Sequence, residues 1–237
     1  YGLGERENAK PYLEAYRKLD PGGGVSKLLA QIQLAEGNID PAIQSLEGYL
    51  RAHPLDSQAQ ALLASAHMAQ GRPARATSIA REAIKRSDTP ELRTVLGLSM
   101  LRSGQTTDAL QELEAAFKRD PNQLKAAATL VGLYIQRGQH PKALALADTL
   151  VKRAPRNPTY HMLQGQARQA TGDVRGARAA YEEAARIDPE HRGAQIQLAR
   201  LDVEAKAFDV AERRLTGLLA KSERDAEVQQ ELAALFD

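Results

Sequence analysis

Cysteine and tryptophan are absent from this chain of 237 residues, and aromatic residues make up only 4% of it. Without cysteine, disulfide bonds, thiol catalysis and thiolate metal sites are excluded, but the cellular compartment stays undecided. The shortage of aromatic residues disfavours strands, which are enriched in aromatic and β-branched side chains. No apolar run approaches the roughly 18 to 20 residues of a membrane-spanning helix. The sequence therefore predicts no direct membrane insertion by this stretch of chain.

A strong excess of charge of either sign is also missing. The formal net charge is +2 at pH 7 and the isoelectric point is about 8.8, which is too little to favour nucleic acid or an anionic membrane as partner. Basic residues cluster within residues 81–86 and 175–186, but acidic residues are interleaved and no stacking aromatic residues accompany them. The sequence therefore predicts no nucleic-acid partner.

Prolines and small residues recur along nearly the whole chain with one period. Three series of residues share a register, with steps of 33 or 34 residues and one double step. They are Pro21, Pro54, Pro121, Pro155 and Pro189; Gly4, Gly37, Gly71, Gly104, Gly138 and Gly172; and Ala9, Ala42, Ala76, Ala109, Ala143, Ala177 and Ala211. Such a period indicates repeated structural units rather than one globular core.

Each period has room for two helices joined by tight turns. Each glycine supplies the left-handed residue that ends the first helix, and each proline ends the second. Three further prolines follow residues that favour helix caps, so the sequence predicts N-caps at Asp40, Thr89 and Asn157. The recurring alanines allow the paired helices to approach closely, since a larger side chain there forces the backbones apart.

This pattern resembles the tetratricopeptide repeat (TPR), whose unit carries small residues at its eighth, twentieth and twenty-seventh positions and a proline near its end. The eighth positions hold Ala30, Ala64, Gly97, Gly165 and Ala199, with Val131 as the exception. The position that packs against them from the second helix holds Leu46, Ala80, Leu113, Ala147, Tyr181 and Leu215. The resemblance implies an all-α fold, a right-handed TPR superhelix (α-solenoid) of stacked antiparallel helix pairs.

Six complete repeats fit the chain, at residues 23–56, 57–89, 90–123, 124–157, 158–191 and 192–225. Residues 1–22 are expected to hold the second helix of a leading repeat, and residues 226–237 the first helix of a trailing repeat. Neither end resembles the polar capping repeat of a solenoid, so we expect the parent protein to continue with further repeats in both directions. Uncapped ends also make self-association by end-to-end stacking a candidate interaction.

The TPR resemblance implies that the first helices of the repeats line a concave groove. The predicted partner-binding residues on this inner wall are Met68, Glu91, Thr94, Leu98, Leu101, Lys125, Ile135, Met162, Gln166, Gln169 and Arg200. The apolar members favour an extended peptide or an amphipathic helix of a protein partner. The alternative interpretation is that some of these side chains only pack between neighbouring repeats.

The chaperone-tail clamp known from some TPR proteins does not match this sequence. That clamp uses lysine, asparagine and arginine at set inner positions to hold a terminal carboxylate. The ninth positions of the repeats here contain no asparagine; they hold Gln31, Ser65, Leu98, Gly132, Gln166 and Arg200. A role as a chaperone cofactor is therefore disfavoured.

Catalysis, cofactor binding and metal binding find no support in the sequence. None of the five histidines belongs to an HExxH or comparable ligand spacing. His67 and His161 fall on first helices, where partly buried packing residues are the favoured interpretation. The glycines at 22–24 lack the preceding strand and the following lysine of a phosphate-binding loop, which indicates a turn. We predict a protein that is not an enzyme.

A narrower resemblance rests on residues 194–201 and 211–215 and on the alanine-rich, arginine-rich repeats. These are similar to bacterial TPR proteins of exopolysaccharide and protein-sorting loci, among them the PEP-CTERM-system TPR lipoproteins associated with exosortase genes. That resemblance implies an exported scaffold in the bacterial periplasm or anchored by lipid at the outer membrane. The alternative hypothesis is a regulatory or targeting TPR module of a larger enzyme, such as a glycosyltransferase.

Overall fold

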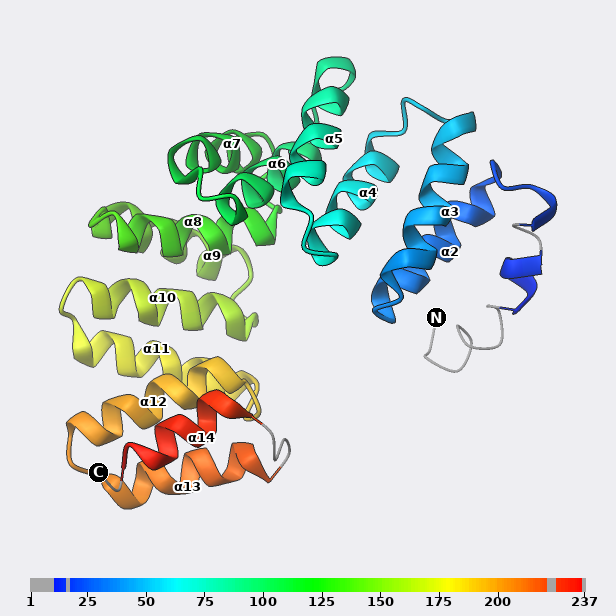
Figure 1. The fold of residues 1–237 in the computed structure, drawn as a ribbon. Helices are drawn as coiled ribbons and strands as arrows, with labels where there is room; N and C mark the ends of the chain where they lie inside the picture. The colour runs from blue at the N-terminus through cyan, green and yellow to red at the C-terminus, as the bar shows by residue number, and fades with distance from the viewer. Residues whose placement is uncertain (1–10, 16–17, 221–224, 236–237) are drawn as a thin grey trace. The chain divides into compact units, whose positions relative to one another are not determined.

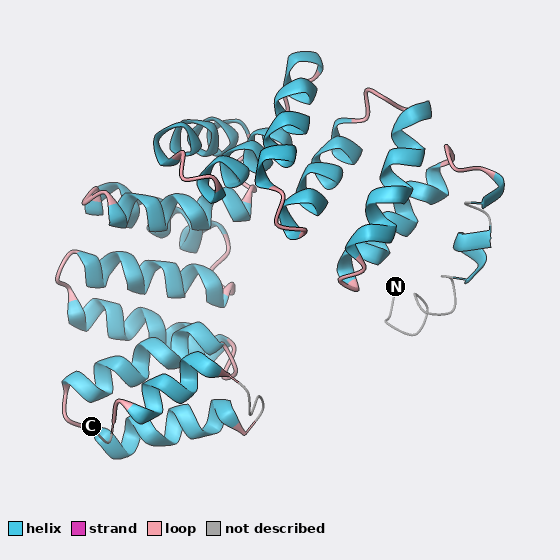
Figure 2. Cartoon of the chain, in the orientation of Figure 1, coloured by secondary structure: helices cyan, strands magenta, loops and turns pink. Residues whose placement is uncertain are grey.

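The computed structural model describes residues 11–15, 18–220 and 225–235 (Figure 1). Every regular element in these residues is a helix, as Figure 2 shows, so the predicted all-α fold of paired, stacked helices is confirmed. The chain divides into two compact units, residues 1–129 and residues 130–237, which we call the N-terminal and C-terminal units. None of the described helices is both long and apolar enough to cross a membrane.

The N-terminal unit consists of consecutive helices that pack against one another in pairs. Its helices are α2 (Gly24–Ala35), α3 (Ile39–Ala52), α4 (Ser57–Ala69), α5 (Pro73–Arg86), α6 (Pro90–Arg102), α7 (Thr106–Arg119) and the first part of α8 (Leu124–Gln136). Helix α2 packs on α3, α4 on α5 and α6 on α7, and the first helices α4 and α6 also touch each other. Residues 11–15 are helical, whereas the rest of the predicted leading helix lies largely outside the described residues.

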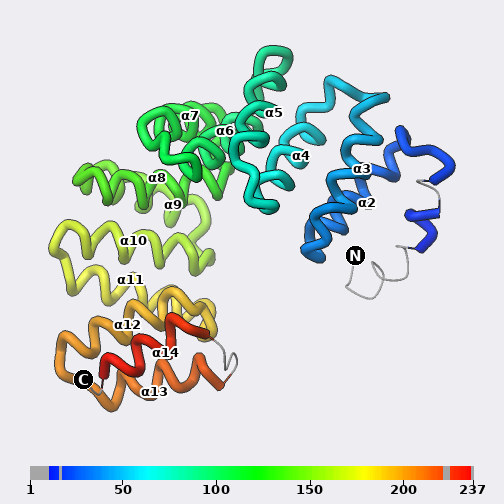
Figure 3. Tube along the Cα trace, in the orientation of Figure 1, coloured from blue at the N-terminus to red at the C-terminus, as the bar shows by residue number. Residues whose placement is uncertain are grey.

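The C-terminal unit continues the same alternation, which the trace in Figure 3 follows from green to red. It contains the rest of α8, α9 (His140–Arg153), α10 (Pro158–Ala170), α11 (Val174–Ile187), α12 (Arg192–Glu204), α13 (Phe208–Leu219) and α14 (Ala226–Ala233). Helix α10 packs on α9 and α11, α12 packs on α11 and α13, and α14 lies against α13 and α12. The repeat boundaries given above stay a prediction.

The glycine series forms the turns inside the helix pairs, as predicted. Gly37, Gly71, Gly104, Gly138 and Gly172 all have a positive φ, between 69° and 83°. The turn at Gly104 is typical, because the N–H of Gln105 donates to the carbonyl of Met100 at 2.9 Å and closes the first helix. The next place in the series holds Lys206, which adopts the same left-handed conformation with a φ of 59°.

Two of the three predicted N-caps are confirmed, and one is wrong. Thr89 Oγ1 accepts from the amide of Leu92 at 3.4 Å, and Asn157 Oδ1 accepts from the amide of Thr159 at 3.0 Å. Asp40, in contrast, lies inside the first turn of α3, whose N-cap is Asn38. The glycine turn is so short that the second helix starts directly after it, ahead of the proline.

The predicted close approach of paired helices is confirmed at two eighth positions. A Cβ atom on Gly97 would lie 2.7 Å from Cγ of Leu113, and one on Gly165 would lie 2.3 Å from Cε1 of Tyr181. Real Cβ contacts are essentially never this short, so Leu113 and Tyr181, as they lie in this structure, leave room only for glycine opposite them. The exception Val131 is fully buried in a repeat whose second helix carries only Ala147 at the matching position.

Candidate functional site

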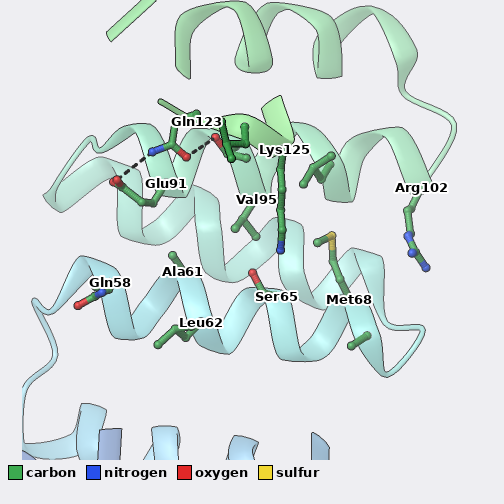
Figure 4. A pocket seen from close by; sticks show the side chains of 14 residues that line it. Gln58, Ala61, Leu62, Ser65, Met68, Glu91, Val95, Arg102, Gln123 and Lys125 are labelled. Atoms are coloured by element: carbon green, nitrogen blue, oxygen red, sulfur yellow. Dashed lines mark hydrogen bonds between the residues drawn. The ribbon is translucent and has the colours of Figure 1, made fainter. Parts of the chain in front are cut away.

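The described part of the N-terminal unit has a pocket on its first helices, formed by α4, α6 and the residues at the start of α8 (Figure 4). Its cavity volume is about 470 Å³. We call it the α4/α6 pocket; it is lined by Gln58, Ala61, Leu62, Ser65, Met68, Ala69, Glu91, Thr94, Val95, Leu98, Arg102, Gln123, Leu124 and Lys125. Five of the predicted partner-binding residues therefore meet in one place: Met68, Glu91, Thr94, Leu98 and Lys125.

Apolar side chains that belong partly to the core form the floor of the α4/α6 pocket. Val95 is buried, while Leu62, Met68 and Leu98 are half-buried. Met68 packs against the core cluster of α4, α5 and α6, and Leu62 packs against the cluster that α4 shares with α3. Because the core holds one side of these residues, the floor stays in place while its other side faces the pocket.

Polar side chains at the amino ends of α6 and α8 close the pocket on one side. The side-chain amide of Gln123 donates to Glu91 at 3.0 Å and to Asp120 at 2.9 Å. The hydroxyl of Thr94 donates to the carbonyl of Pro90 at 2.8 Å and also lies 3.3 Å from Gln123 Oε1. Figure 4 shows the contact between Gln123 and Glu91. Gln123 thereby fixes the start of α8 over α6 and engages the carboxylate of Glu91.

Two cations on the pocket wall have no carboxylate partner among the described residues. These are Lys125, which points from α8 toward α4 in Figure 4, and Arg102 at the end of α6. Lys27 on α2 behaves differently, because its Nζ atom lies 2.8 Å from Oδ2 of Asp56. Burial alone would raise the pKa of Asp56, but hydrogen bonds from Lys27, the Ala59 amide and Tyr49 outweigh it and lower the pKa to about 2.

The remaining predicted residue of the N-terminal unit is Leu101. It is half-buried and packs against the same core cluster as Met68, but it does not line the α4/α6 pocket. The core-packing alternative considered for the inner wall therefore describes Leu101 better than Leu98.

The predicted residues of the C-terminal unit are largely engaged with their own unit. Gln169 accepts a hydrogen bond from the hydroxyl of Tyr181 at 2.9 Å, and Met162 packs against the cluster around that tyrosine. Arg200 forms ion pairs with Glu231 at 2.6 Å and with Glu227 at 3.4 Å. The hydrogen bonds that Arg200 donates to Glu231, together with the attraction of the two carboxylates, outweigh burial and raise the pKa of Arg200. Ile135 and Gln166 are half-buried on α8 and α10.

Sequence reasoning missed Gln123, Leu124 and Arg102 as pocket residues. Gln123 and Leu124 stand at the junction of the predicted repeats 90–123 and 124–157 and are not among the predicted inner-wall residues. A signal was available, because the residue just before a first helix sits beside the first helix of the preceding repeat. Ser65, one of the ninth positions of the predicted repeats, also lines the pocket.

The two buried histidines differ in their hydrogen bonding. Nε2 of His161 lies 2.8 Å from the carbonyl oxygen of Pro155. Gln60 and Gln195 make the same contact with the carbonyls of Pro54 and Pro189, at 2.6 Å and 2.9 Å. His161 therefore belongs to a recurring bond between the start of a repeat and the proline turn before it.

His67 is buried, and neither of its ring nitrogens has a hydrogen-bond partner in the described structure. Burial lowers the pKa of His67, and the nearby Arg75 lowers it further. The described residues contain no group of three His, Asp or Glu side chains that could hold a metal ion.

Comparison with solved structures places the fold among known repeat proteins. A tetratricopeptide repeat protein from Parabacteroides merdae ATCC 43184 matches with a TM-score of 0.76 at 15% identity, over 99% of this chain and 93% of that one. A chain of the APC/C hetero-tetramer Cut9-Hcn1 matches with a TM-score of 0.78 at 15% identity, over 99% of this chain and 46% of that one. YrrB, a TPR protein with an unusual peptide-binding site, matches with a TM-score of 0.55 at 16% identity, over 78% and 96%.

The search of curated proteins found no match to this sequence. The family model described as tetratricopeptide repeat matches three stretches that together make up more than half of the chain, residues 1–66, 100–167 and 169–235. A second model of the same description matches residues 57–82. Together with the helix pairs and their glycine turns, these matches show that the chain belongs to the tetratricopeptide-repeat family.

Proposed function

We propose that this chain is a non-catalytic scaffold or adaptor that binds a peptide or a segment of a partner protein through its first helices. TPR proteins commonly mediate protein–protein interaction and are generally not enzymes. The observation that carries the proposal is the α4/α6 pocket, where an apolar floor formed by Leu62, Met68 and Leu98 lies beside two cations that form no ion pair with a described residue. Such a floor suits the apolar side chains of a partner segment.

The chemistry of the pocket wall also favours binding over catalysis. Its lining contains one carboxylate, Glu91, and no histidine. Glu91 accepts a hydrogen bond from the side-chain amide of Gln123 at 3.0 Å. General acid–base catalysis needs a group that can deliver and take up a proton next to the reacting atom, usually with a second group to set its pKa.

The structural neighbours lend support of a general kind. YrrB is described as having a peptide-binding site, and Cut9-Hcn1 is a hetero-tetramer. These descriptions belong to those proteins. Both descriptions agree with the proposal that the first helices of this chain bind a partner segment.

The predicted surface also includes residues of the C-terminal unit: Ile135, Met162, Gln166, Gln169 and Arg200. We give the α4/α6 pocket the leading role because its two cations have no carboxylate partner among the described residues and its apolar floor keeps one side toward the pocket. In the C-terminal unit, Gln169 and Arg200 already have partners within their own unit.

The test is a quantitative pull-down from the native bacterium with wild-type protein and two variants. Leu98→Glu places a charge on the pocket floor, so it should reduce capture of the true partner at least about tenfold. Leu55→Glu is the matched control, because Leu55 is exposed in the turn before α4 and does not line the pocket. Circular dichroism should show the same helical signal for all three proteins. Equal capture by both variants would move the interaction to another surface.

A photo-crosslinking amino acid adds a direct readout. Placed at Ser65, on the pocket wall, it should label the partner, whereas the same group at the exposed Ser78 on α5 should not. Mass spectrometry of the crosslinked peptide then identifies the bound segment. A partner labelled only from Ser78 would contradict the proposal.

For the biological setting we propose bacterial exopolysaccharide or surface-protein export, on the strength of the resemblance carried by residues 194–201 and 211–215. The full gene and its neighbours test this. An upstream lipidated cysteine together with exosortase genes would support it. A catalytic domain in the same polypeptide would instead favour a targeting module of a larger enzyme.

A further inference from the structure

We propose that the occupant of the α4/α6 pocket is an acidic segment, with apolar side chains that enter the pocket and a carboxylate that pairs with Lys125. This inference rests on the proposed function and specifies the chemistry of its partner. It follows from three features of the pocket: its charge, the direction of Lys125 and the apolar floor.

The pocket lining has more positively charged than negatively charged side chains. Its charged residues are Glu91, Arg102 and Lys125, and Glu91 already accepts a hydrogen bond from Gln123. Lys125 and Arg102 form no ion pair with any described residue. Lys27, on a first helix of the same unit, does form such an ion pair, with Asp56. Lys125 and Arg102 therefore differ from Lys27 in having no carboxylate of the described chain beside them.

The position of Lys125 along its helix agrees with this assignment. It lies in the first turn of α8, where the helix end carries a positive partial charge that repels a cation and attracts an anion. The ammonium group therefore gains nothing from the helix that carries it. A carboxylate placed beside it would be attracted by both the side chain and the helix end.

The apolar floor separates a peptide from other anions. Val95, Leu98 and Met68 offer a surface that a free phosphate or a sugar acid does not use. No aromatic side chain lines the pocket, so stacked bases of a nucleic acid find no platform. A segment in which leucine or phenylalanine stands close to glutamate or aspartate satisfies both parts of the pocket.

The experiment compares two short fluorescein-labelled peptides by fluorescence anisotropy. Both carry leucine and phenylalanine at the same positions, interspersed with glutamate in one peptide and with lysine in the other. The glutamate peptide should bind roughly tenfold more tightly, and added salt should reduce this difference. Lys125→Glu should remove or reverse the preference, and Lys125→Gln should weaken glutamate-peptide binding without favouring the lysine peptide.

Lys118→Glu is the matched control, since Lys118 is exposed on α7 and does not line the pocket. It changes the net charge of the protein equally and should leave the preference unchanged. Equal effects of both substitutions would mean that only overall charge matters, which overturns the inference.

The outcomes also separate this inference from the proposed function. If both peptides bind equally and Leu98→Glu abolishes both, the pocket binds segments without charge selection, so the inference fails while the function stands. A preference for the lysine peptide would likewise overturn the inference and leave the proposed function standing. If neither peptide binds to wild type, or if Leu98→Glu leaves binding unchanged, both the inference and the proposed pocket function fail.

Discussion

The two units present first-helix surfaces of opposite character, although both follow the same repeat pattern. In the N-terminal unit, Lys125 and Arg102 stand without an ion-pair partner among the described residues, beside an apolar floor. In the C-terminal unit, Arg200 pairs with Glu231 and Gln169 accepts from Tyr181. The first-helix surface of the N-terminal unit thus keeps two unpaired cations among the described residues, whereas polar side chains on that of the C-terminal unit bond within their own unit.

The C-terminal unit also contains a buried cluster of ion pairs. The carboxylate of Asp202 on α12 is buried and accepts from Arg178 on α11 at 2.7 Å and from Arg214 on α13 at 2.8 Å. Three consecutive helices thereby share one ion cluster. The buried ion cluster of this unit serves its cohesion, whereas Lys125 and Arg102 of the α4/α6 pocket form no ion pair with the described residues. The comparison teaches that a single repeat pattern can leave first-helix cations unpaired in one unit and pair them in the other.

Asp202→Ala is expected to give the largest effect, and it tests the stabilising side of this comparison. Removing the carboxylate leaves two guanidinium groups together without compensation, and it should lower the stability of the C-terminal unit by about 2 to 3 kcal/mol. Both arginines are partly exposed, which keeps the loss below the upper range for a fully buried pair. Hydrogen–deuterium exchange resolved by peptide would locate the loss.

The control for Asp202→Ala is Asp202→Asn, which keeps an acceptor oxygen and should lose less stability. Binding of the glutamate peptide by the N-terminal unit should not change in either variant. Weakened peptide binding would break the comparison, because it would mean that the C-terminal network also serves the binding surface.

His67 gives the N-terminal unit a stability that depends on pH. Burial lowers the pKa of His67 in the folded state, so below the usual value of about 6.5 the unfolded chain binds more protons than the folded one. Stability of the N-terminal unit should therefore be constant above this pH and fall as the pH drops toward the folded pKa. The slope is limited to about 1.4 kcal/mol per pH unit for one proton.

Urea titrations at several pH values measure this slope, with His67→Gln as the control that lacks the titrating group. Charged groups facing His67 are Arg75 and Arg72, which oppose its protonation, and Glu47, which favours it. A wild-type slope that persists in His67→Gln would assign the pH dependence to other groups.

Sequence reasoning predicted the backbone of this molecule better than its side-chain contacts. The glycine turns and the match of Gly165 with Tyr181 follow from local sterics, which a period in the sequence reports directly. The cap at Asp40 failed because the start of α3 depends on the geometry of the preceding turn rather than on the proline that follows.

The site was only partly predictable for a related reason. The position within the repeat predicts both Leu98 and Arg200 as inner-wall residues. It does not predict that Glu231, on a later helix, lies close enough to form an ion pair with Arg200. Gln123 was missed because its contact with Glu91 joins two repeats across 32 residues of sequence. Which inner residues stay free depends on such long-range pairings, and these depend on packing rather than on the repeat pattern.

Lys206→Gly is expected to give the smallest effect, a gain of about 0.5 to 1 kcal/mol in the stability of the C-terminal unit. Lys206 has a φ of 59° at the place where the earlier turns use glycine, and a side chain there is strained by its own backbone. Gly172→Lys is the reverse control, because a Cβ at Gly172 meets no atom within 4 Å and any loss reports backbone strain alone. Urea titration followed by circular dichroism measures both. If Lys206→Gly brought no gain while Gly172→Lys cost stability, the lysine side chain would itself stabilise the turn, and the C-terminal unit would owe still more of its cohesion to polar side chains.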